Sequence, residues 1–116
     1  MSKPENDLRI DYIELVVGDI EKAKEFYGSL FSWKFQDYGP DYSSFNDGRL
    51  DGGFRKGETV AGGPLLVLYA VDLEGIEKKV AQTGGQINKP IFSFPGGRRF
   101  HFIDPSGNEL ASWSDK

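Results

Sequence analysis

The feature that most restricts the fold of this chain is an order of elements that occurs twice. Residues 10–17 alternate in polarity with the period of a β-strand. Asp19 then stands where the N-cap of a helix belongs, and apolar residues recur at helical spacing until Phe31-Ser32. Turn signals at residues 39–40 and 46–48 separate three further strand-like segments, at 33–38, 42–46 and 50–54. The first half therefore predicts a strand, a helix and three strands.

The second half repeats this plan. Residues 65–71 predict a strand, Asp72 an N-cap, and the spacing of Leu73, Ile76 and Val80 a helix that closes at Gly84-Gly85. Strands at 86–94, 98–103 and 108–113 follow, divided by Gly- and Pro-containing turns. A module of this length is hard to stabilise alone. We therefore expect one α+β domain over 1–116, with βαβββ modules at about 10–55 and 65–113 and a small polar join at 57–63.

Charge and composition exclude several classes of protein. The net charge of −4 gives no broad positive field, so we expect neither nucleic acid nor an anionic membrane as a partner. The chain has no cysteine, which rules out disulfides, thiolate zinc sites and a cysteine nucleophile. Residues 1–7 are polar, and no run approaches the roughly 18 apolar residues of a spanning helix. We expect a cytoplasmic protein.

Two motifs carry a resemblance to a known family. In the segment from Ile13 to Phe35, a strand, an Asp cap and a helix containing Phe26-Tyr27 lead to a turn at Trp33. The segment 104–108, Asp-Pro-Ser-Gly-Asn, precedes the last predicted strand. Both motifs, and the repeat, resemble the vicinal-oxygen-chelate superfamily of glyoxalase I, bleomycin-resistance proteins and extradiol dioxygenases. The resemblance covers nearly the whole chain and implies that the two βαβββ modules form a cupped mixed sheet.

The resemblance also implies four positions for metal ligands, which metal-using relatives fill with His, Glu or Gln. When the motifs are matched, the residues at these four positions are Tyr12, Gly52 or Gly53, Leu65 or Leu66, and Ala111. None of these side chains is a usual ligand for zinc, manganese, iron or nickel. We therefore predict no cofactor, while a divalent metal at a displaced site that uses Glu14 and Glu109 stays open as an alternative.

Glu14 and Glu109 are the candidate catalytic residues. Glu14 lies on the strand side opposite Ile13 and Leu15, where the family cup would lie. A carboxylate tuned by desolvation there can exchange a proton with a substrate. The competing interpretation of Glu14 is a structural acid whose hydrogen bonds are satisfied.

Four further residues are candidate ligand-binding groups. Arg99 and His101, the only histidine, fall on one side of their strand. One of the adjacent arginines, Arg98 or Arg99, could bind an acidic group through a bidentate guanidinium contact. Trp113 shares the parity of Ala111 and offers a flat surface, while Tyr12 offers a hydroxyl. For each of these residues, an ordinary structural role is the competing interpretation.

These observations favour a metal-free binding protein that holds a small hydrophobic or aromatic molecule in an aromatic-lined cup. The resemblance implies a homodimer, in which the partner completes or caps the cup. The alternative is a lyase, isomerase or dioxygenase, either metal-dependent with atypical ligands or metal-independent through Glu14 or Glu109. A third hypothesis is an accessory subunit whose cup no longer functions.

Overall fold

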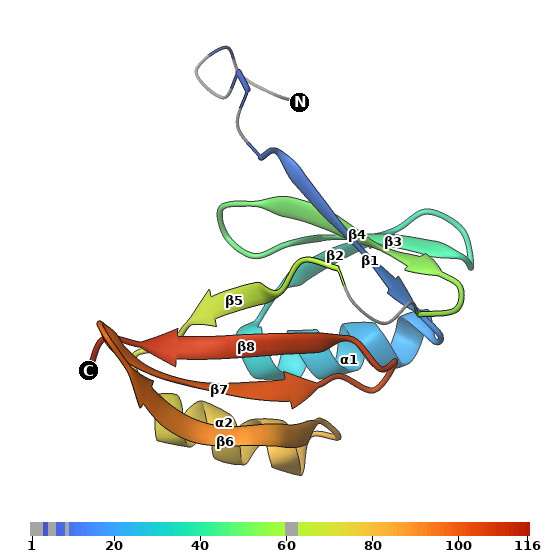
Figure 1. Cartoon of the computed structure of the whole chain (residues 1–116). Helices are drawn as coiled ribbons and strands as arrows, with labels where there is room; N and C mark the ends of the chain where they lie inside the picture. Colours follow the sequence, from blue (N-terminus) through green and yellow to red (C-terminus); the bar gives the residue numbers. More distant parts are fainter. Residues whose placement is uncertain (1–3, 5–6, 9, 60–62) are drawn as a thin grey trace.

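The computed structural model describes residues 4, 7–8, 10–59 and 63–116, and its elements follow the predicted repeat (Figure 1). The first module consists of β1 (Tyr12–Val17), α1 (Ile20–Phe31), β2 (Lys34–Asp37), β3 (Tyr42–Asn46) and β4 (Asp51–Lys56). The second consists of β5 (Leu66–Tyr69), α2 (Leu73–Gln82), β6 (Gln86–Phe94), β7 (Gly97–Ile103) and β8 (Glu109–Ser114). The α+β class and the two βαβββ modules are confirmed.

The two predicted aspartate caps begin the helices. The Asp19 carboxylate accepts a hydrogen bond from the backbone N–H of Lys22 at 3.0 Å, and that of Asp72 accepts one from Gly75 at 3.1 Å. These bonds satisfy backbone donors that have no partner inside a helix. Helix α1 ends where Ser32 adopts the left-handed conformation with φ of 61°.

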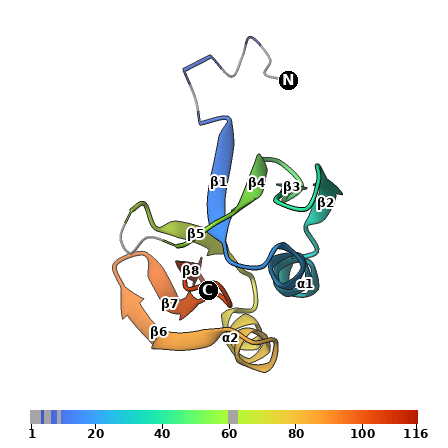
Figure 2. The same ribbon diagram turned by 90° about the vertical axis from the view of Figure 1, so that its right-hand side faces the viewer.

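The strands form two separate four-stranded mixed sheets rather than one continuous sheet. Sheet A has the order β1-β4-β3-β2 and sheet B the order β5-β8-β7-β6. In each sheet the first two strands of that order are parallel and the others antiparallel. In Figure 2, α1 lies at the right below sheet A, and α2 lies at the bottom beside β6 of sheet B.

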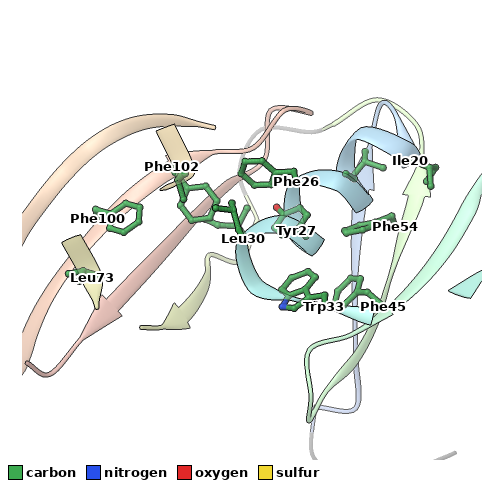
Figure 3. Close-up of a cluster of buried hydrophobic side chains, with 14 residues drawn as sticks. Ile20, Phe26, Tyr27, Leu30, Trp33, Phe45, Phe54, Leu73, Phe100 and Phe102 are labelled. Carbon is green, nitrogen blue, oxygen red and sulfur yellow. The ribbon is translucent and has the colours of Figure 1, made fainter. Parts of the chain in front are cut away.

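Helix α1 packs between the two sheets. The Tyr27 ring lies 5.4 Å from that of Phe54 on β4, while the Phe26 ring lies 6.2 Å from that of Phe102 on β7. Trp33 stacks between Tyr27 at 4.7 Å and Phe45 on β3 at 4.4 Å (Figure 3). Helix α2 adds Leu73 and Val80 to the same core and packs on sheet B. Because the two helices cover one face of each sheet, the opposite faces point away from this core. We call these opposite faces the outer faces of sheets A and B.

A buried carboxylate ties the two modules together at the predicted turn before β8. Asp104 accepts hydrogen bonds from the Tyr27 hydroxyl at 2.8 Å and from the backbone N–H groups of Ser106 and Asn108 at 2.9 and 2.8 Å. The Asn108 side-chain amide donates to the Val16 carbonyl at 2.8 Å. Burial, and then the Asp104 charge, raise the pKa of Tyr27 well above its ordinary value. The turn therefore fastens the second module to β1 and α1.

Among the described residues, none of the helices is long and apolar enough to cross a membrane. This finding does not test the predicted cytoplasmic location, which stays a prediction.

The bond between Tyr27 and Asp104 is predicted to contribute measurably to stability. Tyr27→Phe keeps the ring but removes a donor from a buried carboxylate, which we expect to lower the free energy of unfolding by about 1–3 kcal/mol. Urea unfolding measures this loss, with Tyr38→Phe as the control because Tyr38 is 58% exposed. Equal stability of the Tyr27→Phe variant and the wild type would contradict the role given to Asp104.

Candidate functional site

The outer face of sheet B carries four of the six predicted site residues. Arg99 and His101 point to this face, because Phe100 and Phe102 between and beyond them are fully buried against the helices. Trp113 lies directly opposite Arg99 in the sheet, and Ala111 lies opposite His101. The sequence placed Arg99 and His101 on one side of their strand and left open which side it was. The structure assigns them to the side away from the core.

Aromatic rings from three strands line this face. Tyr69 on β5 meets Trp113 edge-on at 5.3 Å, and Phe94 on β6 lies 6.4 Å from Trp113. Phe92, also on β6, stacks on the His101 ring at 5.9 Å. Tyr69 is 49% exposed and Phe92 37% exposed, so a single chain leaves much of this aromatic surface uncovered.

His101 is held by the Glu109 carboxylate, which Asn88 also contacts. Its Nδ1 atom lies 2.9 Å from Glu109 Oε2, and the Asn88 side chain donates to the same oxygen at 3.1 Å. The bond to His101, followed by that to Asn88, lowers the pKa of Glu109. The His101 side chain is buried, and its Nε2 atom has no hydrogen-bond partner in the structure. This arrangement fixes the imidazole and leaves Nε2 without a hydrogen bond.

Arg99 lies over two aromatic rings and differs sharply from its neighbour. Its guanidinium carbon is 5.6 Å from the ring centres of both Phe92 and Phe94. Its Nε atom is buried without a hydrogen-bond partner. Arg98, in contrast, points to α2 and forms an ion pair with Glu74. The two adjacent arginines therefore have different surroundings, since Arg98 pairs with a carboxylate and Arg99 packs against aromatic rings.

Two hollows lie where β1 and β5 approach each other. The first, of about 510 Å³, adjoins the His101 and Glu109 pair and is otherwise lined mainly by apolar residues, among them Leu65, Leu66 and Ile103. The second, of about 450 Å³, follows β1 past Tyr12 and Glu14. Both volumes are in the range of small-molecule sites.

The outer face of sheet A carries a polar cluster around Glu14. The Tyr42 hydroxyl donates to Glu14 Oε2 at 3.2 Å, and Arg55 Nε donates to Oε1 at 3.2 Å. The hydroxyls of Tyr12 and Tyr42 are 2.5 Å apart. Because Tyr42 gives its proton to Glu14, Tyr12 must donate to Tyr42. Burial, and then the bond to Tyr12, raise the pKa of Tyr42.

Gly53 makes room for this cluster. A Cβ atom at Gly53 would overlap the hydroxyls of Tyr42 and Tyr12, so a larger residue would displace both tyrosines. The sequence predictions missed Tyr42 and Arg55, as they missed Asn88 near His101. Only the strand register could have revealed the first two, since it places Tyr42 opposite Arg55 and Glu14 opposite Gly53.

The predicted site residues thus form two groups. Tyr12 and Glu14 lie on the outer face of sheet A, whereas Arg99, His101, Trp113 and Glu109 belong to sheet B. In the part of the chain that the structure describes, no hydrogen bond or ion pair joins the two groups. Their use as ligand-binding or catalytic residues stays a prediction.

The positions that match metal ligands in relatives do not fit a metal ion. Ala111 is buried and has no donor atom, Gly53 has no side chain, and Tyr12 bonds to Tyr42. Within residues 10–59 and 63–116 and the short described N-terminal parts, no group of three His, Cys, Asp or Glu side chains could hold a metal.

The lowered pKa of Glu109 predicts a dependence of stability on pH. A carboxylate whose folded-state pKa is below its ordinary value, near 4.5, stabilises the fold above that value and loses this contribution as the pH falls through the folded-state pKa. The stability difference between wild type and Glu109→Gln should therefore be largest near neutral pH and vanish in acid. Urea unfolding at a series of pH values checks this, and a difference that grew in acid would contradict it.

The amino-acid sequence matches known proteins that share this fold. Residues 9–111 match the family model described as the Glyoxalase/Bleomycin resistance protein/Dioxygenase superfamily. Proteins of Mycobacterium tuberculosis and Mycobacterium bovis, both named "Putative glyoxylase CFP32", are 28% identical over 118 residues. This match covers 89% of the chain and only 44% of those relatives, so the chain spans less than half of their length.

Solved structures show the same fold at low sequence identity. A glyoxalase/bleomycin resistance protein/dioxygenase family enzyme from Burkholderia phytofirmans superposes with a TM-score of 0.82 at 16% identity, covering 92% of this chain and 100% of that chain. The fosfomycin resistance protein FosX of Mesorhizobium loti gives a TM-score of 0.78 at 16% identity, with 92% of each chain covered. The match over residues 9–111 shows that the chain belongs to the glyoxalase/bleomycin resistance protein/dioxygenase superfamily.

Proposed function

We propose that the chain is a small-molecule-binding member of this superfamily that needs no metal, and that its ligand is a small hydrophobic or aromatic molecule. The observation that carries the proposal is the aromatic outer face of sheet B. There Phe92 and Phe94 lie against Arg99, Phe92 stacks on His101, and Trp113 contacts Tyr69 and Phe94. A partly exposed aromatic surface with a few polar groups is typical of a site for a flat organic molecule.

The side chains at the metal-ligand positions support the metal-free part of the proposal. Relatives that use a metal bind it through His, Glu or Gln, and this chain has Tyr, Gly, Leu and Ala there. The polar groups that remain are suited to hydrogen bonding and ion pairing with an organic ligand rather than to a closed metal coordination shell.

The alternative, a metal-independent proton-transfer enzyme, is favoured by one observation. Glu109, itself bonded to Asn88, fixes the Nδ1 side of His101, and both His101 and Glu109 line a hollow of about 510 Å³. In that case His101 would exchange the proton and Glu109 would position it. Glu14, which is engaged by Tyr42 and Arg55, is the less suitable base of the two predicted carboxylates.

We also propose that the protein acts as a homodimer in which the partner covers the outer face of sheet B. The sheet order makes β1 and β5 edge strands, and exposed apolar side chains gather along β5 and its flanks. Val67 is 44% exposed and Val71 is 68% exposed. Edges and apolar surfaces of this kind are normally covered.

Binding of a neutral fluorescent probe tests the proposed function. Protein treated with a chelator, and shown by elemental analysis to hold no stoichiometric metal, should bind N-phenyl-1-naphthylamine and raise its fluorescence. Trp113→Ser removes a ring from the face and should weaken binding about tenfold, while Tyr38→Ser on an exposed loop should not. Absence of binding, or binding that requires an added divalent ion, would contradict the proposal.

Sedimentation velocity tests the proposed dimer. The wild type should sediment as a dimer, and Val67→Lys combined with Val71→Lys should shift it to a monomer, because charges are costly in an apolar interface. Tyr38→Lys is the control. A wild-type protein that stays monomeric over the accessible concentration range would contradict the proposed homodimer.

A further inference from the structure

Arg99 presents a positive charge on the outer face of sheet B without a negative partner in the described residues. Its neighbour Arg98 bonds to Glu74 and donates to the Lys116 carbonyl at 3.1 Å. On the outer face of sheet A, Arg55 pairs with Glu14 at 3.2 Å. Among the described ion pairs and side-chain hydrogen bonds none includes Arg99. The chain thus neutralises Arg98 and Arg55 and leaves Arg99 for another molecule.

Contacts with two aromatic rings also hold the Arg99 side chain in a position that is suited to ligand binding. Its guanidinium carbon lies over the rings of both Phe92 and Phe94, 5.6 Å from each centre, and these contacts help to hold the planar group in place. Its buried Nε atom lacks a hydrogen-bond partner, and leaving such a donor unpaired costs free energy. A carboxylate is the group that best matches this fork, because its two oxygens accept two parallel N–H bonds.

A second unpartnered nitrogen lies on the same face. His101 is two residues from Arg99 on β7, and its ring stacks on Phe92 at 5.9 Å. Nδ1 is bonded to Glu109, and Nε2 is buried and has no hydrogen-bond partner in the structure. The Glu109 carboxylate that could repel an anion is itself engaged by His101 and Asn88. Both unpaired nitrogens therefore lie beside one aromatic ring.

We infer that the ligand of this face is a planar aromatic carboxylate, whose carboxylate binds Arg99 and whose ring packs among Phe92, Phe94 and Trp113. The inference rests on the proposed function and adds the chemical class of the ligand. The aromatic rings bind the apolar body, which a simple inorganic anion lacks. The guanidinium selects the anion over a neutral molecule of the same shape, because none of the described ion pairs neutralises its charge.

Isothermal titration with two matched probes tests this inference. 2-Naphthoate and 2-naphthamide have nearly the same shape and differ in charge. The wild type should bind 2-naphthoate about tenfold or more tightly than 2-naphthamide, as expected for a charge-assisted forked contact. Arg99→Gln should abolish this preference but still bind 2-naphthamide. Arg98→Gln, which removes the same charge one residue away, should keep the preference, because Arg98 faces α2.

The outcomes separate the inference from the proposed function. Equal affinity for the two probes in the wild type would overturn the carboxylate inference and leave an aromatic-binding site. A preference lost equally in Arg98→Gln and Arg99→Gln would also overturn it, since the cause would then be general charge. Failure of the wild type to bind either probe or N-phenyl-1-naphthylamine would overturn the proposed function as well.

Discussion

The packing of α1 between two sheets is the constraint on which the rest of the structure depends. Its rings contact Phe54 of sheet A and Phe102 of sheet B, and its Tyr27 hydroxyl bonds to the buried Asp104. Two small modules thereby share one core, which neither is large enough to build well alone. Because α1 and α2 cover the inner faces of the two sheets, each outer face points away from this core.

This arrangement explains why the polar side chains of the chain fall into two groups. On sheet A, Glu14 is satisfied by Tyr42 and Arg55, above a glycine that gives the tyrosines room. On sheet B, Arg99 and His101 each retain an unpartnered nitrogen among aromatic rings. The cluster on sheet A, whose polar groups are hydrogen-bonded, is suited to a supporting role. The cluster on sheet B, which has unpaired nitrogens, is better suited to bind a ligand.

Local sequence patterns predicted the elements well because their causes are local. Asp19 and Asp72 cap the helices by bonding to residues three positions later, and alternation separates Arg99 and His101 from Phe100 and Phe102. Contacts between distant segments were not predictable in the same way. Tyr42 and Arg55 meet Glu14 only through the register of three strands, and Asn88 reaches Glu109 across β7. Which side of each strand faces the core likewise depends on how α1 packs, and the alternation within a strand does not reveal this.

The two tryptophans allow one direct measurement of the central claim, that the outer face of sheet B binds the ligand. Trp113 lies on this face, whereas Trp33 is buried in the core between Tyr27 and Phe45. Nuclear magnetic resonance resolves their two indole N–H signals during a titration with 2-naphthoate. We predict a saturating shift of the Trp113 signal and an unchanged Trp33 signal. A Trp113 signal that stays in place while the probe binds would contradict the claim.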